Sequence, residues 1–224
     1  MKRFLTPFVG IVTLLVLGAC SDLSTTPDAP AALAPEAAAE RGAANRAPAP
    51  GDAAIAEIVV AATEAEEAEF TLLLAAIEYI AETNPDSGLI EGLFNNDQYT
   101  VFAPTDAAFT ALVAAVAGLV DADVLAGEGP FAAIDDLLGE GTIEAVVSYH
   151  VAEGRRAANS VVPPNARQVR TIETLLAGAT FTVANDLGIT AVGSSASIAA
   201  PNISASNGII HVIDAVLLPI DLGL

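Results

Sequence analysis

The chain has 224 residues and a formal net charge of −20, from 28 acidic and 8 basic side chains. So acidic a protein repels nucleic-acid phosphates and anionic lipid head groups, and neither is expected as a partner. Hydrophobic residues make up 53% of the chain and charged residues 16%, which is enough apolar content for a packed core.

The first segment is typical of a secretory signal. Lys2 and Arg3 precede an apolar run, Phe8 to Leu17, that is too short to span a bilayer. Leu17-Gly18-Ala19-Cys20 resembles the lipobox of bacterial lipoproteins, in which the cysteine becomes a lipidated N-terminus. We therefore expect residues 1–19 to be a lipoprotein signal peptide and Cys20 to carry the lipid.

Cys20 is the only cysteine, so no intramolecular disulfide can form although the expected compartment permits one. Ser21 follows it, and in such lipoproteins a residue other than aspartate at this position indicates the outer membrane or the cell surface. Without residues 1–19 the chain keeps 6 basic and 28 acidic side chains, a net charge of −22. Residues 20–51 are rich in Ala and Pro and lack aromatic side chains, so we expect a disordered tether.

Residues 52–220 are expected to form one domain that begins with helices. Ile55, Ile58 and Val59 recur at helical spacing, and so do the apolar positions between Phe70 and Ile80. An alternating apolar run then predicts a strand at 99–103. Further helices are predicted at 105–117, 131–138 and 142–149.

After Tyr149-His150 the pattern changes to short runs rich in β-forming residues. Strands are predicted at 180–184, 189–192, 196–199, 203–205, 209–213 and 216–218. Helices followed by strands indicate an α+β domain, with helices packed on antiparallel β structure. Asn207-Gly208 predicts a type I′ turn in a hairpin with arms near 202–206 and 209–213.

The stretch YTVFAPTDAAF, residues 99–109, is a polar corner between a predicted strand and a predicted helix. Pro104 cannot donate to a sheet ladder and so ends the strand. Thr105 is a preferred N-cap, and Asp106 in the first turn complements the helix dipole. Because Phe109 then points back to the core, we interpret the corner as structural and not catalytic.

The residues that could carry chemistry do not form a recognisable active site. His211 and Asp214 are near each other in sequence, but alternation places them on opposite faces of a strand. There is no G-x-S-x-G motif and no H-E-x-x-H motif. His150 and His211 could share a metal only if the fold brought them together. We expect no enzyme, no metal and no cofactor.

The basic residues of the domain occupy one segment. They are Arg155, Arg156, Arg167 and Arg170. On an acidic background they could form a local patch that binds an anionic or glycan ligand. The alternative, which we favour, is that each arginine pairs with a nearby acid such as Glu153 or Glu173, because surface ion pairs are common and individually weak.

Several of these stretches together resemble the fasciclin domain family. TVFAPTDAAF (100–109) is similar to the first family signature and NGIIHVIDAVLLP (207–219) to the second, and Tyr149-His150 falls at the family's Tyr-His pair. FTLLLAAIE (70–78) and VRTIETLLAG (169–178) fit the pattern between them. The resemblance implies a β-wedge or sandwich of two sheets with N-terminal and flanking helices. The signature residues expected to have structural tasks are Thr105, Asp106, Phe109, Asn207, Gly208, His211 and Asp214.

The resemblance also implies an extracellular adhesion or interaction module and not an enzyme. In animal members the Tyr-His region has been linked to integrin binding, which makes Tyr149 and His150 candidate interaction residues, although the chain has no Arg-Gly-Asp. The 118–141 excursion looks longer and more acidic than the usual family spacing. We expect a lipid-anchored, extracytoplasmic protein that binds an extracellular or envelope protein or polysaccharide. The alternative is a structural or stress-related envelope lipoprotein without a dedicated ligand.

Overall fold

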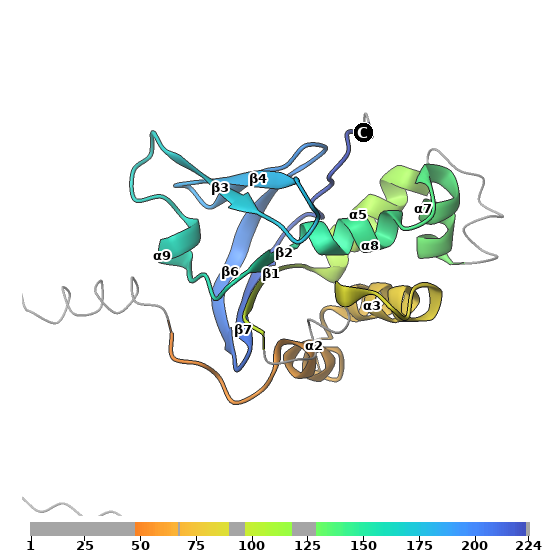
Figure 1. The fold of residues 1–224 in the computed structure, drawn as a ribbon, viewed down its shortest axis with the longest axis horizontal. Helices are drawn as coiled ribbons and strands as arrows, with labels where there is room; N and C mark the ends of the chain where they lie inside the picture. The colour runs from red at the N-terminus through yellow and green to blue at the C-terminus, as the bar shows by residue number, and fades with distance from the viewer. Residues whose placement is uncertain (1–47, 67, 90–96, 118–128, 223–224) are drawn as a thin grey trace, which may run out of the picture.

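The computed structural model describes residues 48–66, 68–89, 97–117 and 129–222. The predicted signal peptide, Cys20, most of the tether and residues 118–128 of the excursion lie outside this part of the chain. Figure 1 shows the described residues as two adjoining regions, a helical region and a β region. Among the described helices, none combines the length and the apolar character needed to cross a bilayer.

The helical region comes from the first part of the domain. Its helices are α2 (Ile55–Thr63), α3 (Thr71–Thr83), α5 (Asp106–Ala117), α7 (Pro130–Leu138) and α8 (Thr142–Tyr149). The three helices predicted after the first strand are confirmed to within one residue at each end. A short helix, α9 (Ala158–Val161), lies at the opposite side of the sheet (Figure 1).

The β region is one seven-stranded sheet with the order β2-β1-β7-β6-β5-β4-β3. The strands are β1 (Tyr99–Pro104), β2 (Val151–Glu153), β3 (Val169–Glu173), β4 (Thr180–Ala184), β5 (Gly188–Thr190), β6 (Ser195–Ala205) and β7 (Gly208–Ile213). The predicted α+β class is confirmed. The expected antiparallel pairing holds for five of the six pairs of neighbouring strands, and β1 and β7 differ from it by running parallel.

Three strand predictions differ from the structure. The two short runs at 196–199 and 203–205 are one long strand, β6, whose register with β7 shifts on both sides of Ala200. The first part of β6 pairs with β5 and the later part pairs with β7. This irregular strand therefore joins the two halves of the sheet. Val216–Leu218 is not a strand. β3 was not predicted, because Ile172 is its one buried side chain and apolar periodicity is therefore weak.

Adjacent residues of β1 serve two different cores. Val101 and Ala103 face the helices, whereas Phe102 belongs to a second cluster enclosed by the β region. Side chains alternate along a strand, so one short strand can anchor both clusters. The ring of Phe102 meets that of Phe181 edge to face, with centroids 4.9 Å apart, an arrangement that stabilises aromatic pairs beyond their buried area.

The hairpin between β6 and β7 turns one residue earlier than predicted. Ala205 pairs with Gly208, so Ser206 and Asn207 are the loop residues. The type I′ prediction at Asn207-Gly208 is wrong, since neither residue has a positive φ. Gly208 is needed for a different reason: a Cβ there would lie 2.1 Å from the Tyr99 carbonyl oxygen and 2.7 Å from Ile55 Cδ1. The side-chain oxygen of Asn207 accepts a 2.8 Å hydrogen bond from Ile55 N at the start of α2.

Side chains of the polar corner at 104–106 cap the N-terminal ends of two helices, α5 and α3. Thr105 Oγ1 accepts a 3.2 Å bond from Ala108 N, which is the expected cap of α5. The carboxylate of Asp106 instead reaches the start of α3, where it accepts bonds from Thr71 N (3.1 Å), Thr71 Oγ1 (2.7 Å) and Leu72 N (2.9 Å). Asp106 therefore joins two helices that are 35 positions apart in sequence. Phe109 is buried with an exposed fraction of 4% and packs edge to face on Phe131.

Replacing Asp106 should weaken the contact between α3 and α5. Asp106→Ala leaves two amides and a hydroxyl without their acceptor, so we expect the free energy of unfolding to fall by about 1–2 kcal/mol in urea titrations. Asp136→Ala is the matched control, because it removes the same charge from an exposed position on α7. Equal effects of the two substitutions would show that net charge, and not the cap, accounts for the loss.

Gly208→Ala should destabilise the domain through close packing. The new methyl group meets the Tyr99 carbonyl and a side chain of α2, so we expect a loss of about 1–3 kcal/mol in thermal or urea unfolding. Gly88→Ala is the control, because a Cβ at Gly88 meets no atom of the described residues within 4 Å, and it should be neutral or slightly stabilising. An unchanged melting temperature in Gly208→Ala would contradict the tight approach of β7 to β1.

Candidate functional site

Tyr149 lies at the end of α8 and is fully buried. Its hydroxyl donates a 2.7 Å hydrogen bond to the Thr180 carbonyl, which begins β4. Its ring packs edge to face on Phe181, with centroids 5.8 Å apart. Burial raises the pKa of the phenol. Tyr149 therefore ties the helical region to the far half of the sheet.

His150 caps the same helix from inside the protein. Its Nδ1 lies 2.7 Å from the Val146 carbonyl, which can only accept, so Nδ1 carries the proton and donates. Its Nε2 accepts a 2.9 Å bond from Leu217 N. The ring is therefore the neutral tautomer, and burial lowers its pKa from 6.5 to about 4.

His211 uses the opposite tautomer on β7. Its Nε2 donates to the Arg156 carbonyl at 2.9 Å, and its Nδ1 accepts from Asn202 N at 3.3 Å. Burial lowers the pKa of this imidazole as well. Asp214 accepts a bond from Ser197 N instead, so it does not orient His211. Both histidines bond to the backbone on each side of the ring, as structural cross-links do.

Neither buried ring offers a surface to a partner. The exposed fraction is 0% for Tyr149 and 3% for His150, so a partner that binds the folded domain would not contact them. The burial of both residues therefore does not favour the interaction role that the family resemblance suggests for this pair. Among the described residues, no group of three or more His, Cys, Asp or Glu is arranged to hold a metal ion.

Arg155 is an internal clamp. Its guanidinium donates to the Ala205 carbonyl at 2.8 Å and to the Gly208 carbonyl, both at the turn end of the β6–β7 hairpin. It also donates to Ser204 Oγ and to the carbonyls of two residues before the domain, Pro48 and Ala49. Residues 48–51, which the sequence predicts to be part of the tether, thus contact the hairpin. Gly51 N also donates to the Ala205 carbonyl.

The other arginines divide between structure and surface. Arg156 donates through Nε to the Glu153 carbonyl at 3.0 Å, and Arg170 donates through Nη1 to the Ser160 carbonyl at 2.6 Å. These bonds of Arg156 and Arg170 go to carbonyl oxygens, and the favoured pairing with acidic side chains stays a prediction. Arg167 is exposed on the turn that leads into β3.

Charge is divided sharply between the two parts of the domain. From Asp52 to Glu153 the chain has 20 acidic residues and no lysine or arginine. From Arg155 to the last residue it has four arginines and four acidic residues. The part of the chain that holds the helical region is therefore strongly negative, whereas the segment from Arg155 to the last residue is close to neutral and carries the cations.

A surface groove lies beside α9, next to these cations. It has a volume of about 580 Å³ and is lined by Ala158, Asn159, Val162, Pro163, Pro164, Arg170, Asn185 and Leu187. We call it the α9 groove. Pyrrolidine and aliphatic groups form its apolar part, while Arg170 and two side-chain amides supply polar groups. Asn185 already donates to the Pro163 carbonyl at 2.8 Å, which fixes the groove wall.

The sequence indicated only part of this groove. Arg170 was a candidate, and Pro163-Pro164 is visible as a rigid turn. Asn185 and Leu187 come from the β4–β5 turn and reach the groove only because β3 pairs with β4. No local motif marks them, and their role follows from the pairing of strands.

Comparison with known proteins agrees with the family resemblance. A model of the fasciclin domain matches residues 68–219. The immunogenic proteins MPB70 of Mycobacterium bovis and MPT70 of Mycobacterium tuberculosis are each 32% identical over 161 residues, which cover 71% of this chain and 68% of theirs. Protein sll1483 of Synechocystis is 30% identical over 153 residues, or 67% of each chain.

Among solved structures, a FAS1 domain pair from the insect cell adhesion molecule fasciclin I is similar with a TM-score of 0.41 and 15% identity. The alignment covers 64% of this chain and 44% of that one. The family model includes α3, the polar corner, both buried histidines and every strand of the sheet, and it leaves α2 outside. The chain therefore belongs to the fasciclin domain family.

Proposed function

We propose that this chain is a lipid-anchored, extracytoplasmic interaction module that binds an anionic polysaccharide through the α9 groove. Membership of the fasciclin family, whose domains are related to cell adhesion, supports a binding role and not a catalytic one. The observation that carries the choice of surface is the charge division. Every basic side chain of the described residues lies between Arg155 and Arg170, and Arg170 lines this groove.

The groove has the chemistry that a sugar chain requires. Arg170 can donate to a carboxylate or sulfate, and the exposed Arg167 lies three positions before it. The amides of Asn159 and Asn185 are suited to hydroxyl groups, and the exposed ring of Pro164 offers flat apolar contact. A ligand with negative groups is favoured here and repelled by the acidic helical region, so electrostatics also orients it.

A second candidate is a structural envelope lipoprotein without a dedicated ligand. One observation favours it: several polar groups of the groove already have partners inside the protein. Arg170 donates to Ser160, and Asn185 donates to Pro163. Ligand binding would add to these bonds or replace them. The two candidates differ in whether a recurrent ligand exists.

The α9 groove can be tested with a soluble chain that begins at Ser21. We expect binding to acidic polysaccharides on a glycan array, with affinity that falls as salt concentration rises. The double substitution Arg167→Gln and Arg170→Gln should weaken binding at least about tenfold, the loss of one or two charge-assisted hydrogen bonds. Arg156→Gln is the control, because it also removes a positive charge but Arg156 does not line the groove. Binding should change little in this variant.

The outcomes separate the candidates. The same chain is also tested on a protein array. Binding there, with no binding on the glycan array, would mean that the ligand is a protein and not a polysaccharide. Equal weakening by Arg156→Gln would point to a diffuse charge effect and not to the groove. No specific binding in either array would favour the structural lipoprotein.

The lipid anchor has its own test. In cells, Cys20→Ala should move the protein from the membrane fraction to the soluble fraction, because the acyl chains that hold the chain at the membrane are lost. Ser21→Ala is the control, since it keeps the cysteine. A wild-type chain that is already soluble after export, or a Cys20→Ala chain that stays membrane-bound, would contradict lipidation at Cys20. Attachment assays with the same strains then show whether anchoring is needed for adhesion.

A further inference from the structure

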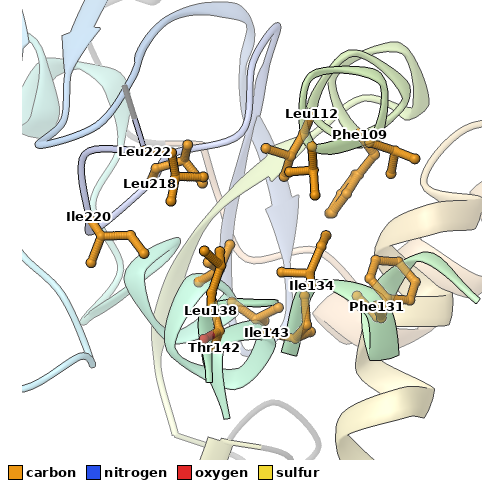
Figure 2. Close-up of a pocket in the computed structure, with 15 residues that line it drawn as sticks. Phe109, Leu112, Phe131, Ile134, Leu138, Thr142, Ile143, Leu218, Ile220 and Leu222 are labelled. Atoms are coloured by element: carbon orange, nitrogen blue, oxygen red, sulfur yellow. The ribbon is translucent and has the colours of Figure 1, made fainter. Parts of the chain in front are cut away.

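The chain after β7 forms a strap across the helical region. We call Val216–Leu222 the C-terminal strap. Figure 2 shows Leu218, Ile220 and Leu222 facing side chains of α5, α7 and α8 across a narrow pocket. The opposite wall includes Leu112, Leu138 and Ile143. The space between them is about 20 Å³ and is lined almost entirely by apolar side chains, so the strap excludes water from the ends of three helices.

Three hydrogen bonds between described residues hold Leu217 and Leu218 of the strap in place. Leu218 N donates to Ser194 Oγ at 2.9 Å, and Gly193 N donates to the Leu218 carbonyl at 3.0 Å. Both of these join the strap to the turn between β5 and β6. The third, from Leu217 N to His150 Nε2 at 2.9 Å, joins it to the end of α8. Of the three, this bond alone depends on a group that titrates.

The bond from Leu217 requires a neutral imidazole. Nδ1 already donates to Val146, so Nε2 must be unprotonated to accept from Leu217. When Nε2 gains a proton from the solvent, two N–H donors face each other. The imidazolium charge would then also lie in apolar surroundings, which disfavours the closed strap further.

Burial is the larger of the two causes that shift the pKa of this ring, and the hydrogen bond to the Val146 carbonyl acts in the opposite direction. Neither cause is a charged side chain. Apolar side chains of α2, α3, β1, α8 and β2 line the pocket that includes His150. With the strap open, the imidazole reaches water and its pKa returns toward 6.5. Protons therefore favour the open form as pH falls below 6.5 and toward 4.

We propose that the C-terminal strap is a pH-sensitive closure, in which protonation of His150 releases Leu217 and exposes the apolar face of α5, α7 and α8. The device uses only the contacts of the fold and does not depend on the proposed ligand. The sign follows from linkage: the open form binds the proton more tightly, so acid shifts the equilibrium toward it. The ratio of open to closed strap rises by about 100-fold between neutral pH and pH 4, the factor that the two pKa values of 6.5 and about 4 give over this range.

Hydrogen–deuterium exchange of the full chain tests the closure. Protection factors, which correct for the intrinsic pH dependence of exchange, are measured by mass spectrometry at pH 7.0, 5.5 and 4.5. We expect protection of residues 216–222 to fall steeply across this range while β4 and β7 keep theirs. Strap protection that stays constant, or that is lost together with protection of the whole sheet, would overturn the proposal.

Two variants identify the group that titrates. His150→Gln supplies an amide oxygen that can accept from Leu217 without titrating, so the strap should remain protected at pH 4.5. His211→Gln is the matched control, because it removes the other buried imidazole, which contacts Arg156 and Asn202 and not the strap. Acid loosening that persists in His150→Gln, or that disappears in His211→Gln, would assign the effect to another group.

A measurement on the unmodified protein covers the case in which His150→Gln does not fold. The nitrogen chemical shifts of His150 and the amide signal of Leu217 are followed by NMR between pH 7 and pH 4. The proposal requires both to change with one shared midpoint. A Leu217 amide that is unaffected while His150 gains its proton would overturn it.

Discussion

β1 and β7 pair in parallel from Tyr99–Gly208 to Pro104–Ile213, although Gly208 follows Tyr99 by 109 positions. A parallel pair cannot be closed by a hairpin, so the chain between the strands must leave the sheet and return. That crossover contains α5, α7, α8, α9 and the five remaining strands, β2 to β6. Because the pairing must wait for distant segments to meet, folding of this domain depends on slow, non-local contacts.

Other features of the domain adjust to this pair. Gly208 is small so that β7 can approach the Tyr99 carbonyl, and the polar corner begins where β1 ends. Thr105 N donates to the Ile213 carbonyl, which continues the pairing one step beyond the strand. The parallel pair also sets the position of the two cores, because alternate residues of β1 enter each of them. A change at this junction therefore reaches both regions.

The sequence was informative where one residue type serves one local task. Helical spacing predicted α5, α7 and α8, and Thr105 was recognised as a cap from its type and place. Prediction from the sequence failed where a side chain contacts residues that are far away in the sequence. Asp106 caps a helix that precedes it by 35 positions, and the glycine in Asn207-Gly208 makes room for another strand instead of forming the turn. The α9 groove was only partly predictable for the same reason, since Asn185 and Leu187 reach it through strand pairing.

Arg155 determines how the domain would respond to a pulling force. Its guanidinium holds Pro48 and Ala49 against Ser204, Ala205 and Gly208, so tension in the preceding chain reaches the β6–β7 hairpin before it reaches any helix. Two of its five hydrogen bonds go to Pro48 and Ala49 and three go to the hairpin, so this one planar group bridges the two segments. A module held at a surface by its N-terminal segment would therefore pass tension directly into the middle of its sheet, and the four-residue stretch at 48–51 would act as a mechanical coupling.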